Sequence, residues 1–352
     1  MRLAFGAVLA LSMLAGAVSA APEKAITVMA SSISEPAMAE AADLADALAD
    51  GGLRILPVAG EGPVQTLTDL VQLDGINAAI LPADVTAFAR RNLILPGIGQ
   101  RVAFIAKTGS ADIHVLARGS ITSLQDLQGK RVNLGNARDH RFVSGSVIFA
   151  TLGIAIVPVP GNPGDAIDLL RNGAIDAVVI TAQKPSALLA PLKAKDGFLL
   201  LAIPASAELA GIYAPQILSA ADYPLLIGTA ETISTLTVSN VLAVVNAKPG
   251  TPAHHLAAKL SAAVFSDSAL LQDVNRRTNW KDINLAAAIP GWTRHAAAAS
   301  SMAASPDNGA RFAAEFRTFL ADNPQSLGDT DDEAALLERF EDWKKTKGKE
   351  PQ

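Results

Sequence analysis

Four consecutive residues, Arg138 to Arg141, place two guanidinium groups, a carboxylate and an imidazole in one short stretch. A guanidinium offers forked, charge-assisted donors that suit a carboxylate or a phosphate bidentately. The pattern therefore predicts a loop that binds a small anion, with Arg138, Asp139, His140 and Arg141 as candidate contacts. A solvated loop in which the arginines pair with Asp139 is the alternative.

The elements expected around this stretch place it where ligands commonly bind. A short helix is predicted between Thr122 and Gly129, then a buried strand at 131–134, and a new helix from about Phe142. The loop thus follows the carboxyl end of a strand and precedes a helix. In α/β sheets, backbone N–H groups and side chains converge on small anions at this position.

From residue 25 onward the chain alternates short apolar strands with helices. The predicted order begins with strand 26–29, helix 36–49, strand 54–58, helix 63–73 and strand 77–81. A helix follows Asp84, and after the central stretch come helix 165–170, strand 175–180, a further helix after Pro185, strand 198–203, and helices at 252–266 and from about 310. Repeated β-loop-α units predict parallel strands with helices on both faces.

Two longer β segments, 101–116 and 235–246, interrupt this alternation. We interpret them as crossings between two lobes. The fold class predicted is α/β, a two-lobed clamshell in which each lobe is a mostly parallel sheet flanked by helices. Lobe 1 is assigned residues 21–110 plus 240–325, lobe 2 residues 111–239, and a C-terminal helix and charged tail residues 326–352.

Other polar side chains follow predicted strands or begin predicted helices, which is the correct side of the sheet for a binding site. Helix capping is an alternative role for several of them, and an aromatic residue of this group could instead belong to the core. The candidate contacts outside the central loop are Ser31, Ser32, Ser34, Glu61, Gln65, Asp84, Gln183 and Trp292.

Motifs of enzyme chemistry are missing from the sequence. The adjacent His254 and His255 point about 100° apart on a helix, so they do not form a metal-binding i, i+4 pair. There is no G-x-S-x-G elbow and no phosphate-binding G-x-x-x-x-G-K-[ST] loop. Asp139, His140 and Ser144 are neighbours on one loop and need not align as a triad. We therefore expect no catalysis, no metal and no cofactor.

Composition and the N-terminus indicate the cellular compartment. The chain has 352 residues, a formal net charge of −5 and no cysteine, so neither disulfides nor a nucleic-acid-binding surface is expected. Arg2, the apolar run 3–17 and the small residues 18–20 have the form of a signal peptide cleaved after Ala20. An uncleaved membrane anchor is the alternative. We expect a periplasmic protein.

Three segments carry a resemblance to a known family. Residues 120–135 (SITSLQDLQGKRVNLG), 79–84 (AILPAD) and 222–224 (DYP) followed by 235–238 (TLTV) are similar to segments of the TAXI family. Members of that family are extracytoplasmic solute-binding subunits of TRAP-type tripartite transporters. The resemblance covers almost all of the chain after the signal peptide.

The resemblance implies a type II-like periplasmic-binding-protein clamshell that closes on a small organic ligand, often a dicarboxylate or an amino acid. It also implies delivery to the membrane permease subunits of a tripartite transporter. The sequence departs from the family at Arg138–Arg141, where members usually carry a Gly-Ser-Gly-Thr loop, and Pro290–Ala296 only loosely resembles a late family element. We interpret these differences as a retained scaffold with a changed pocket. An ABC-type substrate-binding protein, a periplasmic ligand sensor and an exported hydrolase are the alternatives.

Overall fold

The computed structural model describes residues 25–32, 36–49, 51–266, 271, 284–304, 316–319, 340 and 343. The predicted signal peptide, Ser34 and nearly all of the predicted C-terminal tail lie outside these residues. Within the described part, no helix combines the length and the apolar character needed to cross a bilayer.

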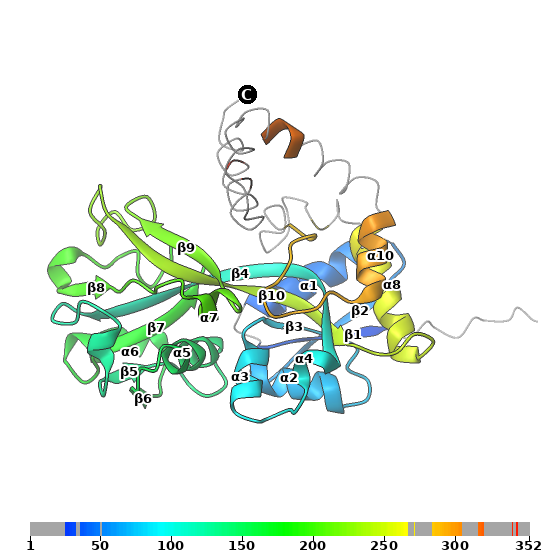
Figure 1. The fold of residues 1–352 in the computed structure, drawn as a ribbon, viewed down its shortest axis with the longest axis horizontal. Coiled ribbons are helices and arrows are strands. Elements are labelled where there is room, and N and C mark those ends of the chain that lie inside the picture. The colour runs from blue at the N-terminus through cyan, green and yellow to red at the C-terminus, as the bar shows by residue number, and fades with distance from the viewer. Residues whose placement is uncertain are drawn as a thin grey trace, which may run out of the picture.

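The chain forms two lobes that lie side by side and are joined by two long strands (Figure 1). Lobe 1 contains β1 to β3, α1 to α4, α8 and α10, and lobe 2 contains β5 to β9 and α5 to α7. Chain segments from both sides of lobe 2 in the sequence thus build lobe 1. The predicted two-lobed α/β clamshell is confirmed.

In lobe 1, three parallel strands lie in the order β2 (Ile55–Ala59), β1 (Ile26–Ala30) and β3 (Ala78–Pro82). Four consecutive residues of β3 are apolar and all of its residues are buried, as expected for a strand covered on both faces. The antiparallel strand β10 (Thr232–Val245) pairs with β3 on its other side.

Lobe 2 repeats this topology although the sequence shows no internal repeat. Its parallel strands lie in the order β6 (Val157–Val159), β5 (Arg131–Asn133) and β7 (Ala177–Ala182), and the antiparallel strand β4 (Val102–Arg118) pairs with β7. In the spatial order of each lobe, three parallel strands therefore lie next to one long antiparallel strand. The hairpin partner β9 (Ala214–Ser219) and the short β8 (Phe198–Leu200) extend lobe 2.

The two crossings, β4 and β10, pair with each other along most of their length. Because each crossing also pairs with the strands of a lobe, hydrogen bonding runs continuously through a ten-stranded sheet. The sequence interpretation expected a pair of sheets joined by two extended crossings. The structure instead curls one sheet through both lobes, and the two lobes remain distinct because separate helices cover each half.

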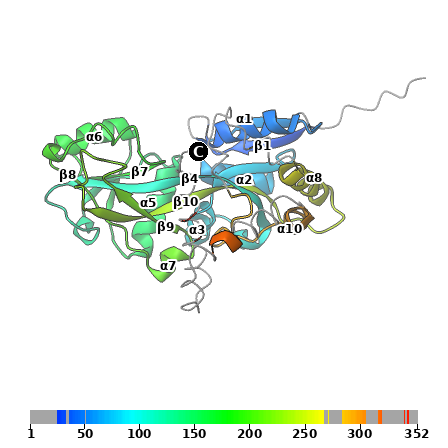
Figure 2. The ribbon, with the colours of Figure 1, turned by 90° about the horizontal axis from the view of Figure 1, so that it is seen from above.

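Helices cover both faces of each lobe (Figure 2). In lobe 1 they are α1 (Pro36–Ala49), α2 (Pro63–Gln72), α3 (Val85–Arg91), α4 (Ile98–Arg101), α8 (Pro252–Ser266) and α10 (Ala296–Ala304). In lobe 2 they are α5 (His140–Thr151), α6 (Pro163–Arg171) and α7 (Ala207–Ala210), with single 3-10 turns at Gln125–Leu127 and Ala194–Asp196.

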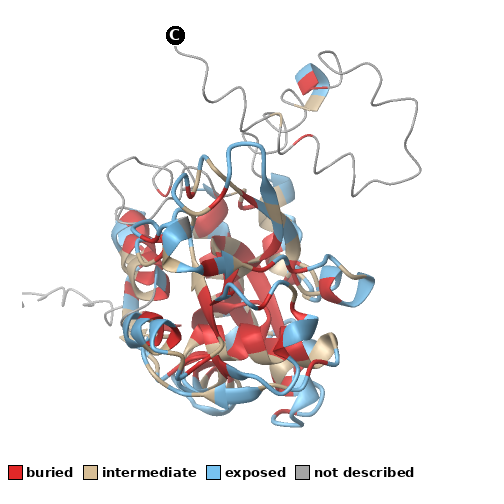
Figure 3. Cartoon of the chain, turned by 90° about the vertical axis from the view of Figure 1, so that its left-hand side faces the viewer, coloured by how far each residue is buried: buried red, intermediate tan, exposed pale blue. Residues whose placement is uncertain are grey.

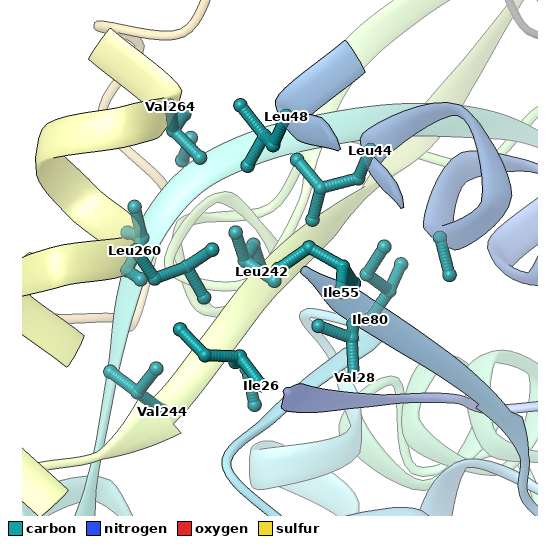
Figure 4. Close-up of a cluster of buried hydrophobic side chains, with 14 of the residues drawn as sticks. Ile26, Val28, Leu44, Leu48, Ile55, Ile80, Leu242, Val244, Leu260 and Val264 are labelled. Carbon is teal, nitrogen blue, oxygen red and sulfur yellow. The ribbon is translucent and has the colours of Figure 1, made fainter. Parts of the chain in front are cut away.

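Separate apolar clusters fill the layers between sheet and helices. In lobe 1, Leu44 and Leu48 of α1 and Leu260 and Val264 of α8 pack over the sheet (Figure 4). The central strands and the inward faces of the helices are buried, whereas the outer loops are exposed (Figure 3). The buried face of α1 is mostly apolar, as expected for a helix that packs against a sheet, but it also buries Glu40 and Asp43.

Local differences from the predicted elements have physical causes. The helix expected after Pro185 is wrong, since residues 187–191 form turns and only the 3-10 turn Ala194–Asp196 follows. The helix expected after Thr122 shortens to the 3-10 turn Gln125–Leu127, because the Asp126 carboxylate accepts from the N–H groups of Thr122 and Ser123 and closes a tight turn. Strand β9 was not predicted.

Candidate functional site

Loops from both lobes meet at the carboxyl ends of the parallel strands. In lobe 1, the loops after β1, β2 and β3 begin at Ser31, Gly60 and Ala83. In lobe 2, the loop after β5 leads into the N-terminus of α5. The central stretch singled out in the sequence thus faces the strand ends of the opposite lobe, as the contacts below demonstrate.

At Gly62 the lobes approach each other backbone to backbone. Gly62 of lobe 1 has φ +115°, and a Cβ built on it would lie 2.5 Å from the carbonyl oxygen of Arg138 in lobe 2. Position 62 requires glycine for two reasons. A residue with a side chain rarely adopts this positive φ, and the contact with Arg138 leaves no room for a side chain. The N–H of Gly62 also donates to the carbonyl of Ser31 at 2.7 Å, which joins the β1 and β2 loops.

An ion pair spans the lobes beside this contact. Nη1 of Arg138 lies 3.2 Å from Oε2 of Glu61, and the two side chains are 73% and 68% exposed. A pair this exposed contributes little to stability because water screens it. Both side chains can therefore exchange this partner for another at small cost.

The buried centre of the interface is the carboxylate of Asp84 in lobe 1. Its Oδ2 accepts from Oγ of Ser144 at 2.6 Å and from the hydroxyl of Tyr213 at 3.0 Å. Nε2 of His140 lies 3.7 Å from Oδ1. All three of these residues belong to lobe 2, so one carboxylate connects three points of the opposite lobe.

The electrostatics of this centre follow from its burial. Asp84 is fully buried, and desolvation raises the pKa of its carboxyl, while His140 and the hydrogen bonds from Ser144 and Tyr213 oppose that rise. Burial likewise raises the pKa of the Tyr213 hydroxyl well above 10.0, and the nearby Asp84 adds to the effect. Oδ1 of Asp84 accepts no hydrogen bond from the described residues.

Apolar side chains complete the contact between α3 and α5. Val143 of α5 is buried within an apolar cluster whose other members belong to lobe 1. The rings of Phe88 and Phe142 meet edge to face, with centroids 6.0 Å apart and planes inclined at 64°. The described conformation is therefore closed, with the lobes packed directly on each other.

Arg141 lies on the other side of the loop, inside lobe 2. Its guanidinium donates to Oδ1 of Asn133 at 2.6 Å and to the carbonyl of Gly161. Burial lowers the pKa of this guanidinium, and the neighbouring Asp139 opposes that shift. Arg141 thus shapes the loop, whereas Arg138 faces the opposite lobe.

Asp139 also has bonds within the loop. Its Oδ2 accepts from the N–H of Asn136 at 2.8 Å and from Nη2 of Arg141 at 3.4 Å. Gly135, with φ +86°, leaves room for this arrangement, since a Cβ there would lie 2.4 Å from the Asp139 carboxylate. The carboxylate and the arginine together fix the path of the loop into α5.

The remaining sequence candidates lie at different depths. Ser31 is buried and its N–H donates to the carbonyl of Ile80, and Ser32 follows it half-buried. Gln65 is exposed and donates to Asp69 one helical turn later. Gln183 is exposed at the end of β7. Nε1 of Trp292 donates to the carbonyl of Ala83, so this half-buried ring supports the β3 loop from lobe 1.

Tyr213 is not marked by any sequence pattern considered above, and no ligand-binding role was predicted for Ser144. Tyr213 is separated from Asp84 by 129 residues and lies in the short segment between α7 and β9. No local pattern marks it, although a tyrosine in an otherwise aromatic-poor chain is one signal that could have been weighed. Its position depends on the hairpin that the sequence did not reveal.

Two hollows flank α5, and Asp84 lines neither of them. One, of about 390 Å³, lies within lobe 2 and is lined mainly by apolar residues that include Phe142, Phe149 and Ile156. The other, also about 390 Å³, lies between α3 and α5 and is lined by Arg90, Arg91 and Ile212, among others. Within the described part of the chain, no cluster of three His, Asp or Glu side chains is arranged to hold a metal.

A family model described as the NMT1-like family matches residues 100–298. No curated protein matches the sequence. The similar solved structures include the periplasmic binding protein BugD, at 13% identity and TM-score 0.46, covering 83% of this chain and 97% of that chain.

Two further solved structures belong to other classes of protein. A histidine kinase sensor domain with similarity to periplasmic binding proteins has 13% identity and TM-score 0.42, covering 74% of this chain and 98% of that chain. The substrate-binding protein of an amino acid ABC transporter has 13% identity and TM-score 0.40, covering 73% and 96%. Scores at this level do not assign the chain to one of these classes.

Proposed function

The chain belongs to the NMT1-like family, and from this membership and the two-lobed fold we propose that it is an extracytoplasmic solute-binding receptor. In this proposal a small organic ligand binds between the lobes and stabilises their closed arrangement. Transfer of the ligand to a membrane partner follows opening. The protein acts by binding, without a cofactor and without chemical conversion of the ligand.

One observation carries the proposal. The carboxyl ends of the parallel strands in both lobes face the junction between the lobes. Each lobe presents its loops at the carboxyl ends of three parallel strands, where α/β proteins bind small molecules. A ligand that contacts both lobes shifts the population toward closure by its differential affinity for the two states. Arg138, Glu61, Asp84 and His140 are the predicted contacts that face across this junction.

The proposed ligand is a carboxylate or an amino acid, with Arg138 as its counter-charge. Arg138 is exposed and its present partner, Glu61, contributes little stability, so a ligand carboxylate can replace that partner. Ser31 and Ser32 follow β1 and Asp139 immediately precedes α5, whereas Gln65 lies in the first turn of α2 and Gln183 follows β7. Arg141 acts indirectly by holding the loop.

The finer proposal is a TAXI-type receptor of a TRAP transporter in the periplasm, with the permease subunits as partner. The three similar segments described above support it. An ABC-type binding protein or a sensor component has the same architecture and a different partner. Reconstituted uptake with candidate TRAP-type and ABC-type membrane subunits distinguishes these classes, because only the cognate transporter accumulates solute with this receptor.

The deciding experiment has two steps. Native mass spectrometry of protein purified from its own periplasm weighs the ligand that it carries, and isothermal calorimetry then measures that ligand's affinity for wild type and Arg138→Ala. Loss of affinity in Arg138→Ala supports the assignment. Arg171→Ala is the matched control, since Arg171 is also exposed and ion-paired but lies on α6. Equal affinity in all three proteins would exclude Arg138 as the counter-charge.

A further inference from the structure

A second buried carboxyl, that of Glu40, lies where the two crossings leave lobe 1. Glu40 is on α1 and is 3% exposed. Its Oε2 accepts from Oγ1 of Thr108 on β4 at 2.6 Å, and its Oε1 accepts from Nδ2 of Asn240 on β10 at 3.0 Å. One side chain therefore binds both crossings, with one carboxyl oxygen for each.

These contacts coincide with the boundary between the lobes. Pairing of β10 with β3 of lobe 1 ends at Asn240, and pairing of β4 with β7 of lobe 2 begins at Asp112. Between these points the crossings have mainly each other as partners. The register between β4 and β10 also shifts at Asn240/Val241, which leaves Thr108 without a partner on β10. Bulges of this kind are places where paired strands bend.

The crossing strand β4 is shaped to admit Glu40. A Cβ built on Gly109 would lie 2.2 Å from Oε1 of Glu40, and the φ of Gly109 lies outside the left-handed region. Glycine at this position is therefore explained by the space that the carboxyl occupies and not by backbone conformation. Burial raises the pKa of Glu40, and the hydrogen bonds from Thr108 and Asn240 oppose that rise.

We propose that Glu40 is a positioning residue for lobe closure, which sets the angle at which β4 and β10 leave lobe 1 by holding both at the bulge. The inference rests on the proposed function only in that closure is what presents the site to a ligand. Without Glu40 the two donors lose their common acceptor, and the crossings can bend over a wider range of angles.

The test measures the distance between the lobes without any ligand. Because the chain has no cysteine, Leu73→Cys and Leu199→Cys place one spin label on each lobe at exposed positions. Double electron–electron resonance then gives the distribution of lobe–lobe distances. We expect one narrow peak for wild type and for Glu40→Gln, whose amide oxygen can accept from Asn240 while its amide nitrogen donates to the hydroxyl of Thr108. For Glu40→Ala we expect a broad distribution extending to longer distances.

A matched control separates hinge geometry from general loss of stability. Leu44 lies one turn further along α1 and is fully buried in the lobe 1 core, and its side chain has no polar atom, so Leu44→Ala destabilises the same helix while leaving the hydrogen bonds of Glu40 to the crossings in place. We expect Leu44→Ala to keep the narrow distance peak. Broadening in Leu44→Ala as large as that in Glu40→Ala would overturn the proposal.

Gly109 supplies a second, independent variant. Gly109→Ala displaces the Glu40 carboxyl and is expected to broaden the distances as Glu40→Ala does. Adding Gly109→Ala to Glu40→Ala is expected to have no further effect, because the space is then free. Two outcomes would contradict the role given to Glu40. One is a distance distribution in the double variant that is broader than in either single variant, and the other is no broadening in either single variant.

Affinity measurements keep this proposal separate from the proposed function. If Glu40→Ala reduces the closure-competent population to about a tenth, the apparent dissociation constant of a confirmed ligand rises about tenfold. Broadened distances with no ligand found for wild type would support the hinge role while removing the receptor function. A confirmed ligand together with unchanged lobe–lobe distances in Glu40→Ala would support the receptor function and remove the hinge role of Glu40.

Discussion

At the scale of single residues, the two arginines of the central loop have different roles although the sequence treats them alike. Arg138 extends to the opposite lobe and is exposed, whereas Arg141 turns into lobe 2 and meets buried acceptors. The difference arises because α5 begins at His140, between the two arginines. The change from loop to helix at this point directs their side chains differently.

The first prediction concerns the stability of the two arginine variants. Arg141→Ala leaves the buried Asn133 without this partner, and we expect a loss of about 1.5–3 kcal/mol in the free energy of unfolding. Arg138→Ala removes only an exposed pair, for which we expect less than about 1 kcal/mol. Urea unfolding monitored by circular dichroism measures both. Equal losses would contradict the separation of roles.

The second prediction concerns the pH dependence of Asp84. Because its native pKa is raised above the ordinary value of 3.8, the native state retains the proton to higher pH than the unfolded chain does. Its contribution to stability is complete below pH 3.8 and is lost as the pH rises through the native pKa. We expect the stability of wild type relative to Asp84→Asn to fall with rising pH in that window.

Asp126→Asn is the control for this titration. Hydrogen bonds from the N–H groups of Thr122 and Ser123 lower the pKa of Asp126, so its contribution has the opposite sign and is lost as the pH falls. Urea titrations of the three proteins at several pH values compare the slopes. A wild-type slope matching that of Asp84→Asn would show that Asp84 titrates normally.

At the scale of elements, the loop between β2 and α2 limits how closely the lobes approach. Gly62 meets the backbone of Arg138 directly, whereas Gly75 has an open space around its missing side chain. Both glycines have positive φ, at +115° and +93° respectively. This pair therefore separates the effect of backbone strain from the effect of the contact.

The third prediction uses that pair of glycines. Gly62→Ala and Gly75→Ala both introduce a strained residue, costing about 1 kcal/mol or more each. Only Gly62→Ala also places a methyl group against the carbonyl of Arg138, so only this variant is expected to open the lobes. Small-angle X-ray scattering should show a larger radius of gyration for Gly62→Ala than for wild type. The same increase in Gly75→Ala would assign the effect to strain.

At the scale of the whole molecule, contacts between the lobes hold the described conformation closed. They comprise the Asp84 centre, the packing of α3 on α5 and the exposed pair of Arg138 with Glu61. Most of these interactions are individually modest. Opening the lobes therefore breaks a small set of modest interactions, which suits the proposed receptor role, in which the ligand must be released.

The fourth prediction removes one of these contacts and leaves the lobes otherwise intact. Tyr213→Phe keeps the ring in the lobe 2 core and deletes the hydroxyl that donates to Asp84. A loss of about 1 kcal/mol in the closed state raises the open population about fivefold. The spin-label pair at Leu73→Cys and Leu199→Cys reports that population.

Tyr223→Phe is the matched control for this change. Its hydroxyl lies 2.7 Å from Nε2 of His114, entirely within lobe 2. We expect Tyr223→Phe to lower stability without altering the distances between lobes. An increase in long distances that is the same in both variants would show that closure does not depend on the contact with Asp84.

The sequence by itself determined the order and type of most elements. The helices Pro36–Ala49 and Pro252–Ser266 have the predicted bounds, and the early strands differ from prediction by one residue at their ends. These features are local, because apolar periodicity, proline at a helix start and glycine at a helix end depend on a few neighbouring residues. The two crossings were found for the same reason, as unusually long apolar β segments.

Only the tertiary structure decided which side chains meet at the junction of the lobes. Asp84 gains Ser144 and Tyr213 as partners, and Glu40 gains Thr108 and Asn240, across separations of 60 to 200 residues. Whether an arginine faces the opposite lobe or the interior of its own lobe also depends on how the loop enters a helix. No local pattern encodes such pairings, because they arise from the packing of strands and helices that are distant in the chain.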